Sequence, residues 1–146
     1  MRPFNHSRVL RTTVLVASVF LLDACMIFMR PPRDLDYGRR RLSETGLYRA
    51  EIRPDGDSIP KGKLQKWTLH LETASGAPID TAKITVDGGM PQHGHGLPTK
   101  PLVTRPLGNG DHLVEGMKFN MGGWWVVKFR VSSTRGADSL VFNLKL

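Results

Sequence analysis

The stretch Trp-Val-Val-Lys-Phe-Arg-Val at residues 125–131 places apolar and basic side chains on alternate positions. Such a period of two is typical of a strand with one buried face. The same period recurs at residues 48–53, 67–72, 82–86, 113–121 and 140–146, and a shorter apolar piece lies near residues 102–105. Turn residues separate these segments, as in Ser-Gly-Ala-Pro at 75–78 and Gly-Asn-Gly-Asp at 108–111. The sequence therefore predicts an all-β, immunoglobulin-like β-sandwich of about seven strands.

Within the segment 113–121, Leu113, Met117, Phe119 and Met121 all have the same parity and are expected on one face. The segment 125–131 is expected to bury Trp125 and to expose Lys128 and Arg130. Outside the N-terminus no segment has the period of a helix. A disulfide between the sheets is excluded, because Cys25 is the only cysteine of the chain.

The composition is that of a folded protein with a basic surface. The 146 residues have a formal net charge of +8, with 40% hydrophobic and 23% charged residues. The basic residues are dispersed, and the only tight run is 39–41. No basic stripe interleaves with aromatic residues, and no signature of a nucleic-acid-binding motif is present. We therefore expect no nucleic-acid partner.

The N-terminus has the pattern of a targeting segment. Arg2, Arg8 and Arg11 precede the apolar run 12–22, and the wider stretch 9–29 is long enough to cross a bilayer as a helix. In one interpretation the stretch is an uncleaved anchor. In the other, Leu-Asp-Ala-Cys at 22–25 resembles a bacterial lipobox, and Cys25 is the lipidated residue. Both predict a domain tethered to the cell membrane on its periplasmic or extracytoplasmic side.

Three regions follow from this division of the chain. Residues 1–30 form the anchor or signal segment, residues 31–43 a linker with the pair Pro31-Pro32, and residues 44–146 the β-sandwich domain.

Candidate metal ligands gather in the second half of the chain. The segment 90–96 has the sequence Met-Pro-Gln-His-Gly-His-Gly, in which His93 and His95 are two residues apart and project to one side of an extended backbone. Imidazole and thioether ligands together favour copper, and Cu(I) in particular. The predicted copper ligands are Met90, His93, His95, Met117 and Met121. Asp87 and Asp111 are predicted to orient the imidazoles by hydrogen bonds.

The same residues have an alternative interpretation without a metal. A His-x-His pair often forms ordinary hydrogen bonds in a loop, and methionines beside aromatic residues usually fill gaps in a core. His70 and His112 are expected to face solvent rather than to bind a metal.

The residue pattern resembles the YtkA-like family, which is related to FixH-like proteins. The resemblance covers residues 45–146 and includes Gly76-x-Pro78, Ile84-x-Val86, the segment 90–96, Pro101 and the segment 116–125. It implies a membrane-tethered or secreted sandwich, and the FixH-like relatives are associated with copper delivery and oxidase assembly. One departure is the pair Trp124-Trp125, where the family pattern has a single tryptophan. This departure leaves the register of the following strand open.

No motif of a catalytic site is present, so we expect a protein that is not an enzyme. Two functions remain. The first is a copper-binding module for copper handling or oxidase assembly. The second is a metal-free interaction or accessory domain of a membrane complex, with a protein partner.

Overall fold

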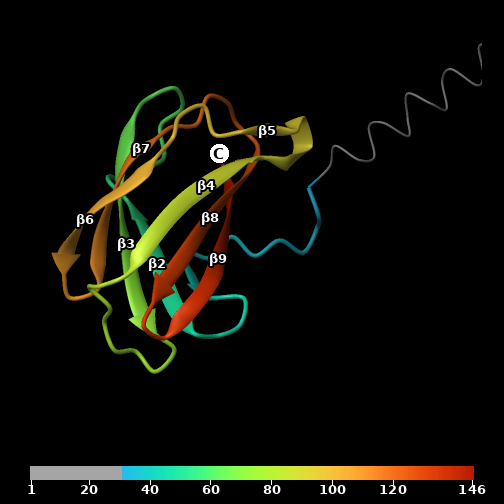
Figure 1. Ribbon diagram of the computed structural model, residues 1–146. Coiled ribbons are helices and arrows are strands. Elements are labelled where there is room, and N and C mark those ends of the chain that lie inside the picture. Colours follow the sequence, from blue (N-terminus) through green and yellow to red (C-terminus); the bar gives the residue numbers. More distant parts are fainter. Residues whose placement is uncertain (1–30) are drawn as a thin grey trace, which may run out of the picture. The chain divides into compact units, whose positions relative to one another are not determined.

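The protein was analysed as a computed structural model that describes residues 31–146. The predicted apolar helix and Cys25 lie outside these residues. Asp34–Leu146 form one compact unit built from two antiparallel sheets (Figure 1). The all-β sandwich architecture predicted from the sequence is confirmed.

The larger sheet has five strands in the order β1-β2-β3-β7-β6. Its strands are β1 (Arg40–Leu42), β2 (Tyr48–Pro54), β3 (Gln65–Thr73), β7 (Asp111–Met117) and β6 (Leu102–Gly108). The smaller sheet has four strands in the order β5-β4-β8-β9. Its strands are β5 (His95–Gly96), β4 (Lys83–Met90), β8 (Trp124–Ser133) and β9 (Gly136–Lys145). A short 3-10 helix, η1 (Pro91–His93), connects β4 to β5 at one end of the sandwich.

The core lies between the inner faces of the two sheets. The large side chains of Trp67, Phe119 and Trp125 are fully buried and contact one another, with ring centroids 5.8 Å apart for Trp67 and Phe119 and 5.2 Å apart for Phe119 and Trp125. Burial of a large apolar side chain stabilises a fold by roughly 1.5–3 kcal/mol. This aromatic cluster therefore anchors the end of the core nearest to η1.

The alternation predicted for β8 is confirmed. Trp125, Val127, Phe129 and Val131 are buried, whereas Arg130 is exposed and Lys128 is partly exposed. Trp124 points to the opposite face, where its indole N–H donates to Asn143 Oδ1 at 3.0 Å. The register that the double tryptophan left open is thereby settled, with Trp125 as the inward residue.

Two strands were not expected from the sequence. β1 lies within the predicted linker 31–43, where Arg41 donates hydrogen bonds to Asp36 and the strand pairs with β2. β5 has only two residues, too few for a periodic pattern. The sandwich thus has nine strands rather than about seven, and the folded unit begins before residue 44.

The predicted parity of β7 is wrong at its first half. Gln65 pairs with Met117 and Lys66 pairs with Glu115, so Gly116 is an extra residue without a partner on β3. Gly116 has φ +84°, a conformation that glycine adopts without strain, and it forms a β-bulge. The bulge shifts the parity by one residue. Val114 and His112 therefore point inward together with Met117, whereas Leu113 does not.

Candidate functional site

The segment 90–96 forms a tight turn at one end of the smaller sheet. After Met90, η1 makes a single turn, and Gly94 closes it in the left-handed conformation with φ +64°. The N–H of Gly94 donates to Pro91 O at 3.3 Å. The chain then runs back as β5, so that His95 lies opposite Met90 and Gly96 lies opposite Gly89. The turn therefore carries both candidate histidines on an ordered backbone.

Gly88 and Gly89 allow this turn to lie close to its neighbours. A Cβ on Gly88 would collide with the backbone oxygen of Val126, and a Cβ on Gly89 would collide with the backbone oxygen of His95. Larger residues at either position would push β4 away from β8 or from β5. The adjacent glycines at the end of a strand pattern were the sequence signal for this close approach.

The structure brings His93 and His95 together on the surface. Both residues are exposed, and their rings stack with centroids 5.9 Å apart and planes 25° apart. The His95 ring also contacts the edge of Trp125, with centroids 5.6 Å apart. Because a metal-bound ring nitrogen lies about 2 Å from its ion, rotation of the exposed side chains would let one ion reach a nitrogen of each ring.

A backbone carbonyl determines which nitrogen of His95 is available. His95 Nδ1 lies 3.0 Å from Gly96 O, and a carbonyl oxygen only accepts hydrogen bonds. The contact therefore places the proton on Nδ1 and leaves the lone pair of Nε2 open to a ligand. Among the described residues, none forms a hydrogen bond with the His93 side chain. The pair therefore offers an open nitrogen from each ring.

The three candidate methionines differ in exposure. Met90 and Met117 are buried in the core with 2% and 0% exposure, whereas Met121 is 42% exposed. As cross-strand neighbours, Met90 and His95 project from the same face, and such neighbours have Cβ atoms about 5 Å apart. Met117 lies on the other sheet.

Trp125 joins the two segments that carry the other candidate ligands. Its indole N–H donates to Met121 O at 3.1 Å, while its ring contacts His95. Gly123 makes room for Met90, since a Cβ at this position would collide with Met90 Cε. The loop after β7 and the turn after β4 therefore meet around Trp125.

The two predicted aspartates lie in different places. Asp87 and His95 line one shallow hollow of about 390 Å³, in which Asp87 Oδ1 accepts the N–H of Gly88 at 2.7 Å. Asp111 lies at the first position of β7, six residues before Met117 and roughly 20 Å along the strand from it. The structure therefore does not place Asp111 beside His93 and His95.

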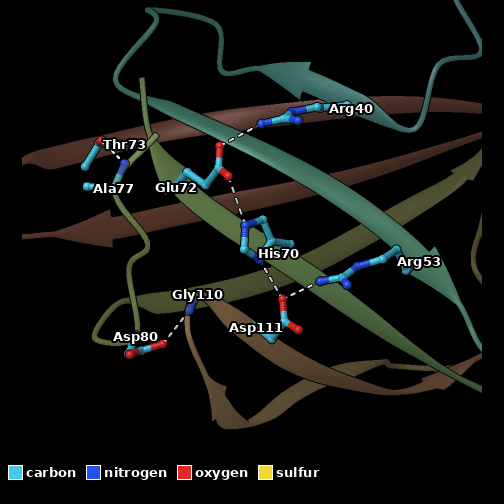
Figure 2. Close-up of polar contacts among 9 residues, drawn as sticks. All are labelled: Arg40, Arg53, His70, Glu72, Thr73, Ala77, Asp80, Gly110 and Asp111. Carbon is cyan, nitrogen blue, oxygen red and sulfur yellow. Dashed lines mark hydrogen bonds and ion pairs between the residues drawn. The ribbon is translucent and has the colours of Figure 1, made fainter. Parts of the chain in front are cut away.

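Asp111 belongs instead to a polar network on the outer face of the larger sheet (Figure 2). His70 Nδ1 lies 2.6 Å from Asp111 Oδ1, and His70 Nε2 lies 3.0 Å from Glu72 Oε1. Arg53 pairs with Asp111, and Arg40 pairs with Glu72 at 2.9 Å. The hydrogen bond with His70 lowers the pKa of Glu72 against the opposing effect of burial, and Arg40 lowers it further. This network joins strands β1, β2, β3 and β7.

The prediction that His112 faces solvent is wrong. Its ring is only 2% exposed, and Nε2 donates to Ile79 O at 2.7 Å. The bulge at Gly116 explains the error, because it reverses the parity of the residues before it.

The described residues contain neither a cluster of metal-binding side chains nor a membrane-spanning helix. Within residues 31–146, no group of three or more His, Cys, Asp or Glu side chains has the arrangement of a metal site. The same part of the chain contains no helix with the length and apolar character needed to cross a membrane.

The turn 90–96 and the segment 116–125 both lie within a region that matches a known family. The family model for YtkA-like proteins matches residues 46–130, more than half of the chain. The chain belongs to the YtkA-like family. No curated protein and no solved structure matches it. The family match includes the turn 90–96, the bulge at Gly116 and most of β8.

Proposed function

We propose that this YtkA-like domain binds copper through His93 and His95, with a thioether from Met90 or Met121 as a further ligand. The observation that carries the proposal is the exposed, stacked pair of imidazoles on the turn after β4, in which the His95 ring contacts Trp125. His95 Nε2 is open because Nδ1 donates to Gly96 O. Imidazole and thioether form a donor set that suits copper, so the residues present fit the metal.

The choice between the two thioethers depends on how copper approaches. Met90 is buried and lies opposite His95 in the strand pair. Its position favours Met90 as a ligand that reaches the copper ion from the core side. Met121 is exposed and lies next to Trp125 through its backbone oxygen, which favours it as a ligand from the solvent side. Met117 has neither feature, and its burial is explained by core packing.

A competition titration tests the copper site. A fragment of residues 34–146 contains the compact unit and lacks the thiol of Cys25, which would itself bind Cu(I). Titrated against a chromophoric Cu(I) chelator without oxygen, the fragment is expected to lose about a hundredfold in affinity on H93A/H95A substitution. The matched control is H70Q, which also removes an imidazole. Both ring nitrogens of His70 contact carboxylates, so this substitution should leave copper affinity unchanged. Equal affinities of the fragment and of H93A/H95A would overturn the proposal.

The two methionine variants then identify the thioether. M90L and M121L each replace sulfur by a carbon side chain of similar volume, which cores tolerate well. The variant that removes the ligand is expected to lower Cu(I) affinity about tenfold and to change Cu(II) affinity much less, since soft sulfur favours Cu(I).

We further infer that the domain is tethered to the cell membrane and acts outside the cytoplasm in copper handling or oxidase assembly. The support is the targeting pattern of residues 1–30, together with the proposed relation to FixH-like proteins. We also propose that the strands of the sandwich are connected as in an immunoglobulin-like fold. We propose further that the domain is not an enzyme. Fractionation of cells that produce the full chain, followed by mass analysis of Cys25, would distinguish an uncleaved anchor from a lipidated N-terminus.

A metal-free interaction domain is the second candidate function. The edge strand β6 favours it, because nearly all its residues are exposed, including Leu102 at 64% and Leu107 at 44%. An exposed edge strand offers unpaired backbone groups to a partner. Co-purification from gently solubilised membranes tests this candidate, and recovery of the protein alone would count against it.

A further inference from the structure

The outer face of the smaller sheet carries a second hollow, of about 570 Å³. It lies where β4 begins and β8 ends, because Lys83 pairs with Ser132 in this region. The opposite end of the same strands pairs Gly89 with Gly96 and carries His95. The second hollow is therefore separate from the proposed copper site.

Two basic side chains line this hollow without a counter-ion. The register places Thr85 opposite Arg130 and Lys83 opposite Ser132, so Lys83 and Arg130 are diagonal neighbours on one face, about 7–8 Å apart. Neither has an ion-pair partner among the described residues. Both side chains therefore project from the same face and line the hollow.

The acidic residues at the same hollow are already engaged. Glu44 pairs with Lys128 at 3.3 Å. Asp138 accepts hydrogen bonds from the hydroxyl of Thr45 at 2.7 Å and from the N–H of Ser139 at 2.7 Å. Burial by itself raises the pKa of Asp138, but these hydrogen bonds together lower it, so the carboxylate stays ionised and its oxygens are held within the fold. Glu44 and Asp138 therefore contact partners other than Lys83 and Arg130.

Hydroxyl groups complete the lining. Thr85 on β4, Ser132 on β8 and Ser139 on β9 all point to this outer face. In the described part of the chain, none of the three hydroxyls has a hydrogen-bond partner. The face therefore presents a guanidinium fork, an ammonium group and three hydroxyl donors.

We propose that this hollow binds a phosphate group through Arg130 and Lys83, with the hydroxyls of Thr85, Ser132 and Ser139 as additional donors. A guanidinium fork matches two oxygens of a tetrahedral phosphate, and a lysine adds a second positive charge for a dianion. The hollow is larger than one phosphate ion, and its volume is that of a small-molecule site. A phosphorylated small molecule or a phospholipid headgroup would both supply this group. The proposal requires neither copper nor a membrane anchor.

The test measures binding of inorganic phosphate to the full chain in a nonionic detergent by calorimetry at constant ionic strength. We expect saturable binding by the unchanged protein and a loss of at least about tenfold in affinity for K83Q/R130Q, since two charge-assisted hydrogen bonds are removed. The matched control is K63Q/K100Q, which removes two exposed charges elsewhere. Absence of saturable binding, or equal losses in both double variants, would overturn the proposal.

A second arm distinguishes the two sources of phosphate. Dihexanoyl phosphatidic acid, a short-chain lipid that carries a phosphate monoester, is compared with glycerol 3-phosphate. Tighter binding of the lipid that is lost in K83Q/R130Q indicates a phospholipid headgroup. Equal binding of both, lost in the same variant, indicates a small phosphorylated ligand. Binding of either compound that survives K83Q/R130Q contradicts the assigned site.

Discussion

The four histidines in the described part of the chain form two pairs that the fold treats differently. His70 and His112 are engaged, the first by two carboxylates on the outer face of the larger sheet and the second by Ile79 O in the core. His93 and His95 are exposed on a tight turn, and His95 Nε2 has no hydrogen-bond partner among the described residues. Engaged polar groups serve the fold, whereas open groups on an ordered backbone are available to a ligand.

The largest expected effect is on the engaged, buried histidine. The substitution H112A removes a buried ring and leaves Ile79 O without its donor, so we expect a loss of about 3 kcal/mol in the free energy of unfolding. Urea denaturation of the 34–146 fragment measures this loss. Copper affinity of the folded variant should not change. An unfolding midpoint like that of the parent fragment would show that His112 does not serve the fold.

The next effect concerns the residue that connects the core with the open pair. The substitution W125F leaves a partial cavity and removes the donor to Met121 O, with an expected loss of about 2 kcal/mol in unfolding free energy. It also removes part of the surface that His95 contacts, so Cu(I) affinity should fall several-fold.

The neighbouring tryptophan supplies the matched control for this prediction. Trp124 lies on the opposite face of β8 and donates to Asn143 Oδ1. Copper affinity should therefore be unchanged in W124F. Similar losses of copper affinity in both variants would mean that the strand as a whole, rather than the contact of Trp125 with His95, matters for the site.

Much of the fold could be predicted from the sequence, because a strand with one buried face leaves a regular pattern. The inward residues Tyr48, Ala50 and Ile52 of β2 and the inward residues of β8 follow this pattern without interruption. The pattern fails at Gly116, where one extra residue reverses the parity. It is also silent on β1 and β5, which are too short to show a period.

The candidate site could be predicted in part. The spacing predicted His93 and His95 on one side of an extended backbone, whereas the structure places them on a tight turn in which their rings stack. The position of Asp111 could not be inferred from its nearness to the histidines in the sequence. Nearness in the sequence does not show which end of β7 lies close to the segment 90–96. The contact of His95 with Trp125 depends on the pairing of the strands across the smaller sheet, and a single sequence does not encode that pairing in a local pattern.

The third prediction concerns the engaged histidine at the surface. In H70Q the network on the larger sheet loses its contacts with Asp111 and Glu72, with an expected loss of about 1 kcal/mol in unfolding free energy near neutral pH. The pKa of Glu72 is lowered in the fold, so its contribution is present above its ordinary pKa of 4.5 and is lost as the pH falls below that value.

Acid unfolding makes this prediction specific. Because His70 is the main cause of the lowered pKa of Glu72, H70Q should lose less stability than the parent between about pH 6 and pH 3. The control is K63Q, which removes an exposed charge outside the network and breaks no ion pair among the described residues. Parallel pH profiles of H70Q and the parent would contradict a role of His70 in holding Glu72 ionised.

The smallest expected effect is on stability when both exposed histidines are removed. H93A/H95A should change the unfolding free energy by less than about 0.5 kcal/mol, because both rings are exposed and neither ring holds two parts of the core together. The same urea titration that detects H112A measures this change. A loss above about 1.5 kcal/mol would mean that His95 serves as a cover for the buried Trp125, and the open pair would then belong to the fold as His112 does. Unchanged stability combined with lost copper affinity would instead assign to His93 and His95 a role that the fold does not need.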